Sequence, residues 1–350
     1  MISQYVSTKI KVISAFAMGL VVLVHSYNYD EKLIGSSIFN TRGFTFFLEN
    51  FISNGFAGVA VPIFFAVSSY LFFLNTNSVK AAFPKMQKRL RTLVLPYLLW
   101  SIWGLLLYFL LQSIPFSKTF FTKDLVAEYS FYKTIRTIFI DPIPYQLWFL
   151  KELIVLMFLS PVLYYLIKFS KYALAIITMI LWCIDFQMPY LSMDSINFFT
   201  LGATVAMLRP SVINLTFSRK YWVMGIVWIA ILLFITINID QKQFDLLRKI
   251  SVLVGLVTVW TIYDVFLINK DLTQSRFYSL FSYSFFVYVF HEPILIIIKK
   301  GMIYMLPKTE LSVLLTYLLS PVIIISLSLI VGGILNRWFN KFYNVLTGGR

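Results

Sequence analysis

Charged side chains are scarce in this 350-residue chain. Only 13% of its residues are charged while 59% are apolar, so it cannot present the charged surface that a soluble globular protein of this length requires. Apolar stretches recur from one end to the other, and no polar block between them is long enough to fold alone. We therefore expect a single membrane domain over residues 1–350, with its core at about 8–336.

Cysteine is nearly absent, and the excess of basic residues is divided among short clusters. The single cysteine, Cys183, excludes an intrachain disulfide framework and a CxxC-type zinc site, and we expect no metal. The net charge of +15 would suit a nucleic-acid partner, but the basic clusters lie between apolar stretches. The preference of cytoplasmic loops for Lys and Arg explains them, so we expect membrane lipid and no nucleic acid around the chain.

Ten apolar segments approach the roughly 20 residues that a helix needs to cross a bilayer. They are predicted at residues 10–28, 56–75, 92–112, 146–167, 172–188, 195–208, 221–239, 250–268, 278–298 and 311–335. If the N-terminus is cytoplasmic, only Asp264 and Asp271 among the acidic residues lie near the inner face, which then carries the whole net charge. The sequence predicts an all-α integral membrane protein of about ten transmembrane helices, with both termini cytoplasmic and two longer outer loops, Asn28 to Gly55 and Ser113 to Tyr145.

Both histidines of the chain fall within apolar segments, where an ionisable side chain is costly. His25 lies near the outer end of the first helix, where an imidazole can deprotonate a hydroxyl or thiol; the alternative is an interfacial histidine that binds the helix terminus. His291 is followed by Glu292 and Pro293 in the stretch SFFVYVFHEPILIII. Proline removes a backbone hydrogen bond and can open the helix toward a hydrated cavity, whereas the alternative is a structural kink with a satisfied polar pair.

A basic cluster precedes the third helix, in the stretch KRLRTLVLPYLLW. Lys88 and Arg91 share a helix face, with Arg89 between them, and such a group can bind the phosphates at the nucleotide end of coenzyme A. The alternative is that the cluster serves topology alone. From Lys9 to His25 a helix rises roughly 24 Å, which is similar to the reach of a pantetheine arm, so a donor held at the inner face would present its thioester near His25.

Trp148 stands at the outer start of the fourth helix, followed by Lys151 and Glu152, in YQLWFLKELIVL. A tryptophan at this depth is typical of the aromatic belt, and the two charged residues can pair with groups at the interface. The sequence favours this structural interpretation for the three residues.

These motifs, in this order, resemble those of the bacterial membrane acyltransferase 3 family, whose members O-acylate envelope glycans. The likeness covers nearly the whole chain: AFAMGLVVLVHS ends just after His25, VAVPIFFAVSSY spans Val59 to Tyr70, and YVFHEP spans Tyr288 to Pro293, with KRLRTLVLPYLLW and QLWFLKELIVLMFLSP between them. Two positions depart from the family. Ser14 stands where an arginine is common, with Lys11 one turn away on the same face, and Ser69 replaces the glycine of an SGY run.

The resemblance implies a membrane O-acyltransferase of the bacterial cytoplasmic membrane. It would move an acyl group, expected to be acetyl, from acetyl-CoA to a hydroxyl of an envelope or exopolysaccharide sugar or of its lipid-linked precursor. The alternative is a polysaccharide or lipid exporter of the same fold, which needs no phosphate-binding group for coenzyme A. The candidate site residues are His25, His291 and Glu292 for catalysis, Lys88, Arg89, Arg91 and Lys11 for the donor, and Trp148 and Tyr288 for the acceptor.

Overall fold

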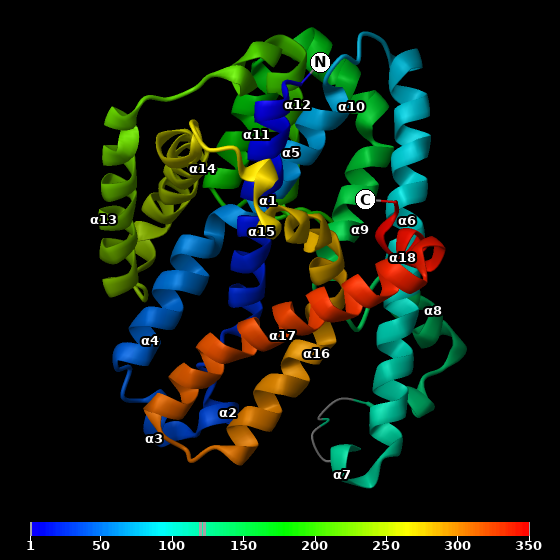
Figure 1. Ribbon diagram of the computed structural model, residues 1–350, viewed down its shortest axis with the longest axis vertical. Coiled ribbons are helices and arrows are strands. Elements are labelled where there is room, and N and C mark those ends of the chain that lie inside the picture. Colours follow the sequence, from blue (N-terminus) through cyan, green and yellow to red (C-terminus); the bar gives the residue numbers. More distant parts are fainter. Residues whose placement is uncertain (1, 119–120, 122–123, 350) are drawn as a thin grey trace.

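The structure is a computed structural model that describes residues 2–118, 121 and 124–349, and within these ranges it is helical and contains no strand. Residues 119–120 and 122–123 of the second predicted outer loop lie outside the described part, as does Arg350. Figure 1 shows an elongated bundle with α6 along one side, α13 along the other and α1 in the centre. The predicted all-α fold class is therefore confirmed.

Each of the ten predicted apolar segments overlaps a helix. These helices are α1 (Gln4–Ser26), α5 (Ala60–Phe73), α6 (Val79–Ser113), α9 (Leu147–Phe158) with α10 (Ser160–Ser170), α11 (Ala173–Cys183), α12 (Met193–Leu208), α13 (Val223–Ile237), α14 (Asp245–Leu267), α16 (Ser284–Met305) and α17 (Glu310–Trp338). Shorter helices lie between or after them: α2 (Glu31–Ile34), α3 (Ser36–Phe39), α4 (Phe44–Glu49), α7 (Pro115–Lys118), α8 (Phe131–Phe139), α15 (Arg276–Leu280) and α18 (Asn340–Thr347).

Not every one of these helices is long enough to cross a bilayer alone. Over the described ranges, seven helical stretches have the length and apolar character of a membrane span. The pair α9 and α10, bent by 63° at a short break, forms an eighth if it is one span, while α11 and α12 are shorter. The chain is thus a multi-pass membrane protein, whereas ten crossings and cytoplasmic termini stay predictions.

The second membrane helix begins earlier than the sequence predicted. Residues 44–55 were expected in an outer loop, but α4, a π-helical turn (Asn50–Gly55) and a 3₁₀ turn (Phe56–Val59) join α5 into one stretch from Phe44 to Phe73. The polar residues that suggested a loop are satisfied inside the bundle: Asn50 Nδ2 donates to Phe46 O at 2.8 Å, and Ser53 Oγ donates to Leu23 O at 3.1 Å. This extension places Glu49 in the packed interior.

The third membrane helix is also longer than predicted, because α6 starts at Val79 rather than near residue 92. Ser78 caps its N-terminus by accepting a hydrogen bond from Ala81 N. Lys85 donates from Nζ to Phe72 O and Leu74 O at the end of α5, where a cation is favoured by the helix dipole. The basic cluster therefore lies on a helix and not in a loop.

The helices α5 and α12 pack closely at Gly202. A Cβ atom built on Gly202 would collide with the carbonyl of Ala66 and with Ser69 Oγ. The backbone of α12 can approach that of α5 this closely only because Gly202 has no side chain. The buried Ser69 hydroxyl donates to Ala66 O at 3.1 Å. The serine that replaces the glycine of the family pattern is accommodated because Gly202 on the facing helix leaves room for it.

Candidate active site

The helix that carries His25 lies at the centre of the bundle. It packs against α5, α14, α16 and α17, and Figure 1 shows α17 passing across its C-terminal end. Ser26 Oγ donates to Tyr317 O on α17 at 3.3 Å. His25, in the last turn of α1, is therefore fixed among helices that are distant in sequence.

The structure brings His25, His291 and Glu292 together. The two imidazole rings lie 5.1 Å apart between centroids, and His25 Nδ1 lies 3.9 Å from Glu292 Oε1. His291 is fully buried and the Glu292 side chain is 3% exposed, whereas the His25 side chain is 15% exposed. The cluster thus pairs one accessible imidazole with a buried carboxylate.

The helix α16 opens at Glu292, as the proline after it predicted. The backbone of Glu292 is non-helical (φ −103°, ψ 141°), and Pro293 has no N–H to bind Val289 O four residues earlier. Gln146 supplies the missing donor: its Nε2 lies 3.1 Å from Val289 O and 3.1 Å from Glu292 O. A side chain from the start of α9 therefore satisfies the carbonyls that the break leaves open.

Two tyrosines complete the immediate surroundings of the histidines. Tyr288 donates from its hydroxyl to Gln146 O at 2.8 Å, and its ring lies 6.4 Å from that of His291. The ring of Tyr145 lies 5.9 Å from that of His25. The hydroxyl of Tyr288, a candidate for binding the acceptor, thus holds the segment before α9 against α16.

Three polar atoms of this cluster are buried and have no hydrogen-bond partner within the described residues: His291 Nε2, Glu292 Oε2 and Gln146 Oε1. Because nearly all buried polar atoms in proteins are bonded, such a group marks a place for a polar ligand or water. His291 Nδ1 lies 3.1 Å from Val287 O, and a carbonyl can only accept, so Nδ1 carries the hydrogen and Nε2 is an acceptor. All three atoms are therefore positioned to accept hydrogen bonds.

The basic candidates lie apart from this cluster. Lys88 and Arg91 are exposed on the N-terminal part of α6, Arg89 is half-buried, and none of the three forms an ion pair within the part of the chain that the structure describes. Lys11 places its ammonium 4.1 Å from the ring centroid of Tyr278. Among the described residues, no hydrogen bond or ion pair joins these cations to His25, His291 or Glu292.

Lys9, from which the reach to His25 was counted, has a structural partner. Its Nζ lies 2.7 Å from Asp264 Oδ1, and both side chains are buried. Asp264 also accepts from the Tyr5 hydroxyl and, at 3.1 Å, from Phe217 N. This buried ion pair holds α1 to α14 and leaves Lys9 committed within the protein.

The residues at the start of α9 are bonded or packed within the protein, and binding of the acceptor by Trp148 stays a prediction. The Trp148 ring packs against that of Phe149, and Lys151 Nζ donates to Ile140 O at 2.9 Å. Glu152 accepts from Ser192 N and from Ser192 Oγ, the latter at 2.7 Å, and so braces the N-terminus of α12.

Four residues around His25 escaped the sequence analysis: Tyr145, Gln146, Glu49 and Lys299. Lys299 Nζ lies 2.5 Å from His25 O, and Glu49 Oε2 accepts from Asn28 N at 3.0 Å. The predicted helix ended at residue 298 and so placed Lys299 just outside the membrane segment, whereas α16 continues to Met305 and carries Lys299 within it. Glu49 was hidden because its helix was predicted as a loop.

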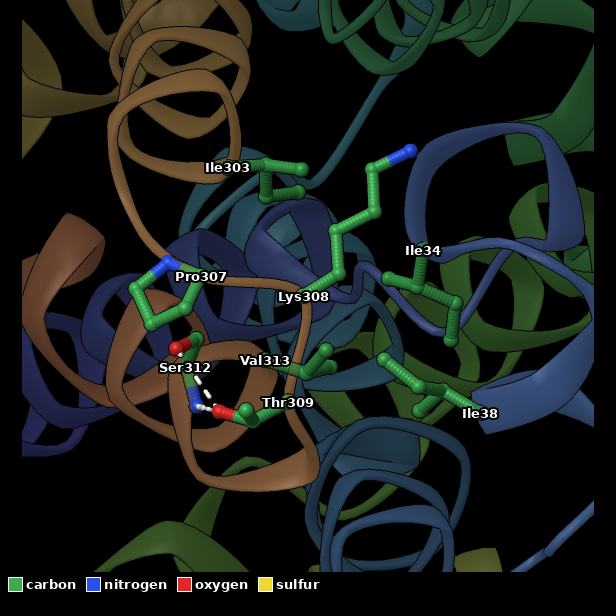
Figure 2. A pocket seen from close by; sticks show the side chains of 8 residues that line it. All are labelled: Ile34, Ile38, Ile303, Pro307, Lys308, Thr309, Ser312 and Val313. Carbon is green, nitrogen blue, oxygen red and sulfur yellow. Dashed lines mark hydrogen bonds between the residues drawn. The ribbon is translucent and has the colours of Figure 1, made fainter.

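Two cavities lie away from the histidines. One, at the turn between α16 and α17, has a volume of about 10 Å³, which holds no more than a water molecule (Figure 2). The other, of about 310 Å³, is lined by apolar side chains of α1, α5, α12, α14 and residues 212–217. Neither cavity is lined by His25, His291 or Glu292, so neither is the binding site of the polar cluster.

Comparison with known proteins gives one match. A family model described as an acyltransferase domain matches residues 9–339, which is most of the chain. No curated protein and no solved structure matches. Over the described ranges, no three His, Cys, Asp or Glu side chains are grouped so that they could hold a metal ion.

Proposed function

Because the chain belongs to the acyltransferase 3 family, we propose that it transfers an acetyl group from acetyl-CoA to a hydroxyl of an envelope polysaccharide sugar or of its lipid-linked precursor. The family makes the protein an acyltransferase for groups other than aminoacyl groups; the donor, the acyl group and the acceptor are the proposed part. The observation that carries the proposal is the accessible His25 imidazole beside the buried Glu292 carboxylate.

His25 acts as the general base in this proposal. Its Nδ1 faces Glu292, which leaves Nε2 to take the proton of the acceptor hydroxyl. The hydroxyl oxygen attacks the thioester carbonyl, the carbon–sulfur bond breaks, and the imidazolium returns the proton to the departing thiolate. The Glu292 carboxylate stabilises the imidazolium, and the separation of 3.9 Å between His25 Nδ1 and Glu292 Oε1 is an ion-pair distance.

The unpartnered atoms of the cluster suit a hydroxyl-bearing acceptor. His291 Nε2, Glu292 Oε2 and Gln146 Oε1 all accept hydrogen bonds, and each hydroxyl of a sugar donates one. His291 therefore orients the acceptor rather than polarising the thioester, since its only ring hydrogen is given to Val287 O. A hydrophobic acceptor would leave these buried atoms unsatisfied.

The donor is assigned to the basic residues of α6. Lys88 and Arg91 are exposed and one turn apart, and the phosphates of coenzyme A are the ligands that such a pair binds well. Lys11 is a further candidate on α1. This arrangement fits a donor from the cytoplasm of a bacterium and an acceptor from the other side of its inner membrane.

The direct test is transfer of label. Purified protein in proteoliposomes is expected to move radiolabelled acetyl from acetyl-CoA to a bacterial polysaccharide or to its lipid-linked precursor, measured by scintillation counting of the isolated glycan. Passage of glycan across the membrane without consumption of acetyl-CoA would support the exporter instead. Empty liposomes and protein without donor are the controls.

Replacing Arg91 by alanine tests the donor site. A hydrogen bond to a charged group contributes about 1.5–3 kcal/mol, so Arg91→Ala is expected to weaken acetyl-CoA binding by about 10- to 100-fold. Isothermal titration of the detergent-solubilised protein measures the change. Lys80→Ala removes a positive charge from an exposed position on the same helix and should bind as the parent does. Parent-like binding by Arg91→Ala would place the donor elsewhere.

A further inference from the structure

Lys299 is a buried lysine in the second half of α16, and its ammonium reaches the C-terminal end of α1. Its Nζ donates to His25 O at 2.5 Å and to Tyr27 O at 3.1 Å. The last carbonyls of a helix have no partner within the helix, so a cation there satisfies them and also offsets the negative end of the helix dipole. Lys299 is thus bonded to the peptide unit of His25 itself.

The chain that follows His25 is held from two further helices. Glu49 on α4 accepts at Oε2 from Asn28 N at 3.0 Å and from Tyr29 N at 3.2 Å. Asn28 Nδ2 in turn donates to Val313 O on α17 at 3.2 Å. The end of α1 is therefore an anchored turn, and Lys299 is the anchor that bonds directly to the residue carrying the imidazole.

The second half of α16 carries two residues that contact His25: Glu292, which faces its ring, and Lys299, which is bonded to its carbonyl. Glu292 stands at the break where this half begins, and Lys299 lies seven residues later, which is two helical turns or about 10 Å. One rigid segment thus presents a carboxylate to the His25 ring and an ammonium to the His25 carbonyl. A shift of α1 relative to α16 would change both contacts together.

We infer that Lys299 is a positioning residue of the proposed acyl transfer, holding His25 at its working separation from Glu292. The inference rests on the proposed function, and Lys299 acts through the backbone of His25 without touching the reacting atoms. Misplacing a catalytic group by about 1 Å can slow a reaction by roughly 100-fold while leaving substrate binding intact. Loss of Lys299 should therefore affect kcat rather than KM.

Kinetics of three variants test the inference. Lys299→Met is expected to lower kcat for acetyl transfer by about 10- to 100-fold and to leave the KM for acetyl-CoA within about twofold of the parent. Lys299→Arg should recover most of the loss, because a guanidinium can also donate to two carbonyls. Lys308→Met removes a positive charge from an exposed residue just after α16 and should behave as the parent (Figure 2).

A second measurement is independent of activity. The chain has only two histidines, so ¹⁵N-histidine NMR gives two pairs of ring-nitrogen signals, and the pair that is lost in His25→Ala belongs to His25. Lys299→Met should shift or broaden the His25 signal, and Lys299→Arg should restore it. An unchanged His25 signal in Lys299→Met would overturn the inference whatever the activity. If the parent protein transfers no acetyl group but Lys299→Met still shifts the His25 signal, the proposed function is wrong while the contact between Lys299 and His25 stands.

Discussion

Replacing His25 by alanine is expected to lower kcat/KM for acetyl transfer by about 10³-fold, within the range that a general base contributes. The variant removes the imidazole that faces Glu292 at 3.9 Å and is the more accessible of the two in the cluster. His291 is a poor substitute, because it is fully buried and its Nδ1 is bonded to the neutral carbonyl of Val287 rather than to a carboxylate that would stabilise the imidazolium. The acceptor hydroxyl would then have to lose its proton to water.

The same variant separates the enzyme from its alternatives. Acetyl-CoA should still bind to His25→Ala, because the proposed donor cations lie on α6, and the melting temperature in detergent should stay near that of the parent. Glycan analysis of cells that produce the variant should show acetyl loss with normal protein levels. An exporter does not need the imidazole for its activity. Acetylation at the parent level in His25→Ala would show that His25 is not the general base.

The helices were predictable where apolar residues dominate a stretch of sufficient length. The segments that became α1, α14 and α17 could be found from the length that a bilayer demands, because single ionisable residues such as His25 and Asp264 do not end the apolar run. The stretch from Phe44 to Gly55 could not, since Asn50 and Ser53 look like loop residues until their partners are known. The partner of Asn50 is Phe46 O, one turn earlier, and the partner of Ser53 is Leu23 O on α1. The composition of the segment does not show that Leu23 lies beside it.

The site was only half predictable, for a physical reason. The cost of an ionisable group in a membrane singles out His25, His291 and Glu292 one at a time, but their contact depends on how α1 and α16 pack. Gln146 is a harder case. Its role exists because Pro293 leaves Val289 O without a donor, and nothing in the sequence links residue 146 to that carbonyl.

Two groups of predicted site residues differ in what the structure adds. Tyr288 donates its hydroxyl hydrogen to Gln146 O, so it helps to hold the site together, and its binding of the acceptor stays a prediction. Lys88 and Arg91 stay predictions, because an exposed basic pair on a helix serves topology and phosphate binding equally well.

Replacing Glu292 by glutamine is expected to lower kcat by about 100-fold with little change in the KM for acetyl-CoA. Glutamine keeps the size of the side chain but loses the negative charge that stabilises the His25 imidazolium, which forms only as the reaction proceeds. Initial rates at saturating donor measure the effect. Glu152→Gln is the matched control, because Glu152 is also a buried carboxylate but is bonded to Ser192, so it should lower the melting temperature rather than kcat. Equal rates for the two variants would contradict the role of Glu292.

The double variant that combines His25→Ala with Glu292→Gln tests whether His25 and Glu292 act as one catalytic unit. If Glu292 acts only by stabilising the protonated His25, its removal has no further effect once the imidazole is gone, and the double variant should be as slow as His25→Ala alone. If instead Glu292 also binds the acceptor through Oε2, which is buried without a partner among the described residues, the double variant should be slower and its KM for the acceptor higher. Comparing the rate of the double variant with that of His25→Ala therefore shows whether Glu292 only stabilises the imidazolium or also binds the acceptor.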